Sequence, residues 1–168
     1  LSPKRQTKRH VAAAVAMFDR CMQMGSSNQY TFFYRGSSSR MLGKLKEAES
    51  DFKESLKYDD QFMDSLLALS DVLMSNENLT EALEICDKTV KLNPKLEFGV
   101  FNRAVCLFRL GELESAEKEF SNSLSINQNN PFAYLYRAMC KMELGKTEEA
   151  IADFEKKIAI DPENPDNF

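Results

Sequence analysis

The stretch that decides the fold is Pro131–Asn164, which reads PFAYLYRAMCKMELGKTEEAIADFEKKIAIDPEN. Its apolar residues recur at helical spacing on both sides of Gly145, a pattern that predicts two amphipathic helices joined by a short turn. The preceding stretch has the same design around Gly111, and the two stretches superimpose along the sequence without a gap. A fixed period of about 34 residues, as here, is the signature of a solenoid built from stacked repeats.

The same period divides nearly the whole chain into four consecutive helix–turn–helix units without an insertion. The predicted units are residues 29–62, 63–96, 97–130 and 131–164. Residues 1–28 are predicted to form a capping helix with a basic start, equivalent to the second helix of a partial repeat. Residues 165–168 are expected to begin a further, truncated unit, so we expect the natural protein to continue past Phe168.

The repeating slots resemble those of the tetratricopeptide repeat (TPR) family. Each predicted first helix carries a large apolar or aromatic slot, occupied by Phe32, Leu66, Val100 and Tyr134. Each predicted second helix carries an alanine, at Ala48, Ala82, Ala116 and Ala150. The resemblance implies an all-α fold, a right-handed superhelical solenoid whose first helices line a concave groove. The unit at 63–96 deviates, because Glu77 replaces the turn glycine and Cys86 replaces a phenylalanine.

One position on the first helix and one position on the second helix change their residue type together from unit to unit. Three first helices carry an arginine, and the second helix of the same unit carries an acid at a constant distance along the chain; these pairs are Arg35 and Asp51, Arg103 and Glu119, and Arg137 and Asp153. In the deviant unit the two slots hold Leu69 and Ile85. This joint change predicts an arginine–carboxylate contact between the two helices. The alternative is a set of independent surface charges.

By the family resemblance, the first helices line a groove that takes up peptides or helices of partner proteins. The predicted lining residues are mixed and polar in the N-terminal half, namely Tyr30, Phe33, Leu67, Asp71 and Met74. They are almost wholly apolar in the C-terminal half, namely Phe98, Phe101, Val105, Phe108, Arg109, Phe132, Leu135, Met139 and Met142. An apolar surface that contains methionine suits an amphipathic helix or a hydrophobic segment.

The tripeptide Asn102-Arg103-Ala104 is similar to repeats of co-chaperones that clamp the acidic C-terminal tails of heat-shock chaperones. That clamp requires lysine, asparagine and arginine at five groove slots. Here the matching slots, counted from the second unit, hold Leu67, Asp71, Asn102, Phe132 and Tyr136. Only Asn102 agrees, and Asp71 would repel a carboxylate; the register that starts from the first unit also fails. We therefore predict no chaperone-tail clamp.

The amino-acid composition excludes several classes of function. A 168-residue chain with 43% hydrophobic residues suits one folded domain, and a net charge of −4 gives no case for a nucleic-acid or membrane surface. No apolar run approaches the ~18 residues of a membrane span. The four cysteines form no CxxC pair and three of them occupy slots that are predicted to face helix packing, which favours a reduced, cytoplasmic compartment. The single histidine, His10, lies outside the repeats, so we predict no catalytic site, metal or cofactor.

The sequence therefore predicts a non-enzymatic scaffold or adaptor segment of a larger protein, binding a peptide or amphipathic helix of a partner in its groove. The first alternative is a structural, self-associating solenoid whose groove is filled by its own chain or by a second copy. The second is a regulatory or targeting domain attached to an enzyme.

Overall fold

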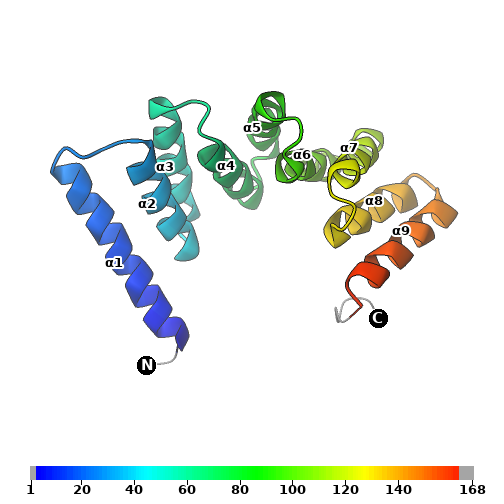
Figure 1. The fold of residues 1–168 in the computed structure, drawn as a ribbon, viewed down its shortest axis with the longest axis horizontal. Coiled ribbons are helices and arrows are strands. Elements are labelled where there is room, and N and C mark those ends of the chain that lie inside the picture. Colours follow the sequence, from blue (N-terminus) through cyan, green and yellow to red (C-terminus); the bar gives the residue numbers. More distant parts are fainter. Residues whose placement is uncertain (1–2, 163–168) are drawn as a thin grey trace. The chain divides into compact units, whose positions relative to one another are not determined.

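The computed structural model describes residues 3–162, with side chains described from Gln6 onward. Helices make up all of the regular structure within these residues, so the predicted all-α class is confirmed. In chain order they are α1 (Pro3–Gln23), α2 (Gln29–Met41), α3 (Leu45–Tyr58), α4 (Met63–Ser75), α5 (Leu79–Leu92), α6 (Glu97–Arg109), α7 (Leu113–Ile126), α8 (Pro131–Glu143) and α9 (Thr147–Ile160) (Figure 1). The chain divides into two compact units, Leu1–Ile85 and Cys86–Phe168, and the division falls within α5.

Helices α2 to α9 alternate between 13 and 14 residues. The turn that joins each shorter helix to the longer helix after it contains a residue in the left-handed conformation. Three of these residues are glycines, Gly43, Gly111 and Gly145, with φ between 76° and 82°. The fourth is Glu77, with φ 61°. Only glycine enters this region without steric cost, so the deviant turn carries strain that the other three lack.

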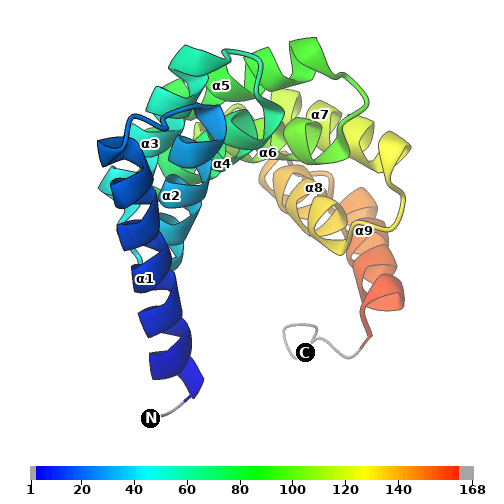
Figure 2. The same ribbon diagram turned by 60° about the vertical axis from the view of Figure 1, so that its left-hand side comes forward.

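The first unit is built on the antiparallel pair α2 and α3, which both ribbon views show side by side (Figures 1 and 2). Alanine and glycine at the small slots bring the two backbones close together: a Cβ atom on Gly36 would lie 2.9 Å from the Phe52 ring. Helix α4 packs on α3 and buries four large apolar side chains, Leu66, Leu69, Val72 and Leu73. Aromatic residues complete this core, with Phe33 in ring contact with Phe52 and Phe62.

Helix α1 packs against α2 at the start of this unit. The ring of Phe18 stacks on Tyr34 with centroids 6.1 Å apart, and Asp19 forms an ion pair with Arg35. The helix therefore covers one face of α2, where the sequence places a cap. The expected start of another unit at residues 165–168 lies outside the described residues.

The second unit contains two helix pairs, α6 with α7 and α8 with α9, and α7 also packs against α8. Figure 2 shows α8 and α9 lying along one another. The most deeply buried part of its core combines small residues with one large ring, and Ala104, Ala116, Phe120 and Ala138 are all fully buried. Three of the four cysteines, Cys86, Cys106 and Cys140, are buried, and Cys21 is exposed.

Candidate protein-binding surface

Arginines on α2, α6 and α8 hold three consecutive helices together. In the first unit, Arg35 donates from Nε and Nη2 to Asp51 on α3, at 2.9 and 2.6 Å. Its Nη1 donates to Asp19 on α1 at 2.7 Å. The hydrogen bond to Asp51 raises the pKa of Arg35 most strongly, so the guanidinium is fixed in its charged form. The structure thus brings together the predicted pair and adds a partner on the preceding helix.

The second unit repeats this arrangement twice. Arg137 forms a two-point contact with Asp153 on α9, at 2.8 and 2.6 Å, and donates to Ser121 on α7 at 3.0 Å. Arg103 lies 3.4 Å from Glu119 on α7, and its Nε lies 3.0 Å from Asp87 on α5.

In all three cases the two partners stand at equal distances along the chain before and after the arginine. In the deviant unit Leu69 takes the arginine position and is buried. The corresponding partner position on the preceding helix holds Lys53, which instead forms ion pairs with Glu49 and Glu81. Charge and apolar burial are thus alternative ways of filling the same position.

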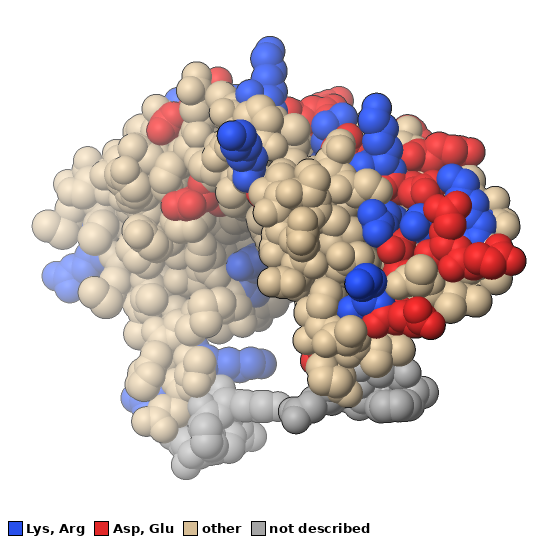
Figure 3. Space-filling view, turned by 45° about the vertical axis from the view of Figure 1, so that its right-hand side comes forward, with Lys and Arg blue, Asp and Glu red and all other residues tan. Residues whose placement is uncertain are grey.

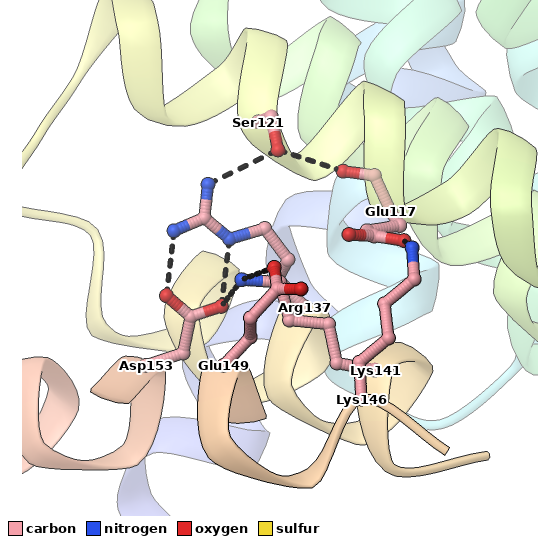
Figure 4. Close-up of polar contacts among 7 residues, drawn as sticks. All are labelled: Glu117, Ser121, Arg137, Lys141, Lys146, Glu149 and Asp153. Carbon is pink, nitrogen blue, oxygen red and sulfur yellow. Dashed lines mark hydrogen bonds and ion pairs between the residues drawn. The ribbon is translucent and has the colours of Figure 1, made fainter. Parts of the chain in front are cut away.

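The contacts of Arg137 belong to a larger polar network, drawn in Figure 4. Lys141 on α8 is nearly buried, and its Nζ lies 2.9 Å from Asp153 and 3.6 Å from Glu149. Burial alone would raise the pKa of Asp153, but the hydrogen bonds from Arg137 and Lys141 outweigh it and lower that pKa below its ordinary value. The network fixes α8 between α7 and α9, and thereby fixes the side chains that α8 presents on its other face.

That other face, together with the corresponding face of α6, is apolar and open to solvent. Phe98 is 45% exposed and Phe132 is 57% exposed, and Met139 and Met142 are exposed as well. The remaining apolar members of the predicted set are half-buried: Phe101, Val105, Phe108 and Leu135. Arg109 is the charged residue of the set and is exposed. We call these nine residues the α6–α8 surface.

Tyr136 organises this surface, although it was not among the predicted lining residues. Its ring stacks on the buried Phe120 with centroids 5.6 Å apart and 10° between the planes. It also meets Phe101 and Phe108 edge-on, at 6.0 and 5.6 Å. Two of the surface residues are therefore held by a ring from the neighbouring helix, which limits their rotamers and pre-organises the surface.

The corresponding residues of the first unit are mixed. Tyr30 is exposed and contacts Phe62 edge-on, while Phe33 and Leu67 are half-buried. Asp71 lies 3.4 Å from Arg40 in an ion pair. Met74 was predicted to line the groove, but it is only 8% exposed. Its long side chain is buried in the α4 core, so that prediction is corrected.

The face shown in Figure 3 has no patch of side chains of one charge that would indicate a second binding surface. Acidic and basic side chains crowd together there, interspersed in one area, and leave the adjoining area with few charges. Mixed signs of this kind offer no single-signed field for a polyanion. Within residues 3–162, no helix has the length and apolar character that a membrane span requires. The described side chains also include no cluster of His, Cys, Asp and Glu arranged to hold a metal ion.

Stacked helix pairs of fixed length, joined by left-handed turns, define a helical-repeat solenoid protein. A family model described as tetratricopeptide repeat matches residues 35–97. Models described as anaphase-promoting complex, cyclosome, subunit 3 and as anaphase-promoting complex subunit 5 match residues 75–157 and 8–60. Together these matches support a protein of the tetratricopeptide repeat family. A search of curated protein sequences gave no match.

Solved structures of the same fold cover nearly the whole chain. The crystal structure of MamA has a TM-score of 0.87 at 17% identity, covering 95% of this chain and 93% of that one. YrrB, described as a TPR protein with an unusual peptide-binding site, has a TM-score of 0.82 at 22% identity, with 95% and 82% covered. TTC0263, a thermophilic TPR protein of Thermus thermophilus, has a TM-score of 0.72 at 18% identity, with 94% and 86% covered. At these identities the likeness concerns the fold.

Proposed function

We propose that the chain is a protein–protein interaction scaffold, and that its α6–α8 surface binds an apolar helix or segment of a partner protein. The observation that carries the proposal is the exposure of Phe98, Phe132, Met139 and Met142 on one pre-organised surface. Exposed apolar patches on folded proteins mark sites of interaction. The description of YrrB as having a peptide-binding site adds a precedent within this fold.

The chemistry of the surface specifies the partner further. Large rings and flexible thioethers accommodate apolar side chains of varied shape, which suits the i, i+3, i+4, i+7 anchors of an amphipathic helix. Arg109, at the C-terminal end of α6, is the charged residue of the surface. We infer that the partner segment presents an apolar stripe. Within this proposal the chain has no catalytic role and acts by holding its partner.

The test is a capture experiment with matched variants. The double variant Phe98→Ser/Phe132→Ser should retain the fold, because both side chains are largely exposed, and should lose the captured partner. Ile126→Ser is the control, because Ile126 is comparably exposed but lies on α7, outside the surface. Captured proteins are identified by mass spectrometry and rebound as purified proteins. Equal capture by the wild type and the double variant would contradict the proposal.

A further inference from the structure

The cysteines of the second unit are protected from oxidants in solution. Cys86, Cys106 and Cys140 are buried, with exposed fractions of at most 1%. Burial raises the pKa of the Cys140 thiol to about 11, so this side chain is neither reached by solvent nor ionised at neutral pH. Oxidants attack exposed thiolates, and burial therefore keeps these three sulfur atoms out of such reactions.

The methionines of the second unit lie in the opposite setting. Within residues 86–168 the sequence holds two methionines, Met139 and Met142, and no tryptophan. Met139 is 38% exposed and Met142 is 57% exposed, and both belong to the α6–α8 surface. The sulfur that solvent reaches in the second unit therefore lies on the surface for which partner binding is proposed.

The same face stays open where a further helix follows it in the chain. Val105 and Phe108 on α6 are equivalent to Met139 and Met142 on α8, and α8 contacts α6. Val105 and Phe108 are nevertheless only half-buried, and Phe98 on the same helix is 45% exposed. A following helix thus covers this face in part and leaves solvent access to it.

A peroxide converts an exposed thioether of this kind into a sulfoxide. The sulfur gives an electron pair to one peroxide oxygen, so that the S–O bond forms and the O–O bond breaks. The proton of the transferred oxygen passes to the departing hydroxide, which leaves as water. Methionine is oxidised by two electrons and the peroxide is reduced by two. A methionine sulfoxide reductase, with a thiol as reductant, returns the sulfoxide to the thioether.

We propose that Met139 and Met142 are reversible oxidation sites whose sulfoxides prevent partner binding, a proposal that rests on the function proposed for the α6–α8 surface. A sulfoxide oxygen is a hydrogen-bond acceptor, and a partner that covers it removes its water. The apolar members of the surface have no hydrogen-bond donor in their side chains to replace that water. The two sulfoxides together therefore weaken binding by about tenfold or more.

Peptide mapping by mass spectrometry, after graded treatment with hydrogen peroxide, tests the two sites. Sulfoxide should appear at Met139 and Met142 before it appears at Met74, which is only 8% exposed. Circular dichroism should show unchanged helix content at that stage. Oxidation of Met74 at the same rate, or a loss of helix content at that stage, would overturn the proposal.

Binding measurements before and after peroxide treatment test the consequence. The probe is the purified protein that the reduced wild-type chain captures and that the Phe98→Ser/Phe132→Ser variant does not. Peroxide should weaken its binding to the wild type by about tenfold or more, and methionine sulfoxide reductase should restore it. The affinity of Met139→Leu/Met142→Leu should be the same before and after peroxide, because leucine has no sulfur to oxidise.

The matched control is Met24→Leu/Met41→Leu, which removes two exposed methionines of the first unit. Its binding should remain sensitive to peroxide, and a loss of sensitivity in this variant would overturn the proposal. Equal binding by the wild type with and without both sulfoxides would overturn the oxidation proposal alone. Equal capture by the reduced wild type and the Phe98→Ser/Phe132→Ser variant would instead contradict the proposed function, and the oxidation proposal with it.

Discussion

The helix pair α8 and α9 and the deviant repeat at residues 63–96 show two ways to build one repeat. In the first, Arg137 and Lys141 neutralise a buried carboxylate, Asp153. In the second, Leu69 occupies the arginine position and is buried among other apolar residues of α4. In both, the turn between the two helices contains a residue in the left-handed conformation, Gly145 in one and Glu77 in the other. Repeat geometry thus tolerates an exchange of charge for apolar burial, provided that both helices change together.

The largest expected effect comes from placing charge where the deviant repeat has none. Leu69→Arg should lower the free energy of unfolding by about 4 kcal/mol, because a buried guanidinium gains no carboxylate and lies at the position that Lys53 flanks. Adding Ile85→Asp should recover a large part of this loss by supplying the missing acid on the second helix. Urea unfolding measures both. Leu69→Met, which conserves volume, is the control and should cost less than about 1.5 kcal/mol.

The converse exchange is expected to have a somewhat smaller effect. Arg137→Leu should lower the free energy of unfolding by about 3 kcal/mol, because Asp153 then remains buried with only Lys141 beside it. The double variant Arg137→Leu/Asp153→Ile copies these two positions of the deviant repeat and should recover part of this stability, because Lys141 then keeps only its contact with Glu149. If the single and double variants unfold at the same urea concentration, the arginine and the acid do not act as a pair.

The two turns provide a finer comparison. Glu77→Gly should raise the free energy of unfolding by about 1 kcal/mol, since glycine enters the left-handed region without the Cβ clash. Gly145→Ala should lower it by a similar amount, and no neighbouring atom lies within 4 Å of the added Cβ, so backbone strain is the sole cause. Equal stability of Gly145→Ala and wild type would show that the turns are not strained as described.

The smallest effect is a pH dependence confined to the charged repeat. The folded-state pKa of Asp153 is lowered, so its stabilisation is complete above the ordinary aspartate pKa of about 3.9 and is lost as the pH falls through the lower folded value. Asp153→Asn should remove this part of the acid sensitivity. Unfolding midpoints measured between neutral pH and acid pH compare the variant with wild type. If stability falls equally with decreasing pH in Asp153→Asn and in the wild type, Asp153 is not stabilised in its ionised form by Arg137 and Lys141.

The helix pairs and their turns could be predicted from the periodicity of the sequence. This is because the spacing of apolar residues and the choice of turn residue determine structure within a few positions along the chain. The pairing of each first-helix arginine with an acid on the second helix was also predictable, because both positions change in the same repeat. The partner on the preceding helix was missed, since Asp19, Asp87 and Ser121 belong to a different repeat and differ in chemistry. It would have been found by aligning each arginine with both flanking helices.

The candidate surface was less predictable than the fold. Tyr136 was missed because its role depends on how α8 packs on α7, where its ring meets Phe120. Met74 was predicted to line the groove from its family slot alone, and the slot does not tell that neighbouring residues bury this side chain. The exposed fraction of a side chain depends on the residues that neighbouring helices pack against it. The sequence of a single repeat does not contain those residues.

Hydrogen–deuterium exchange of the chain with its purified partner is the most direct test of the binding claim. Exchange should slow at Glu97–Arg109 and Pro131–Glu143 when the partner is bound, and exchange in α2 and α4 should stay unchanged. The Phe98→Ser/Phe132→Ser variant should show no such protection. Protection confined to α2 and α4, or to α7 and α9, would contradict binding at the α6–α8 surface.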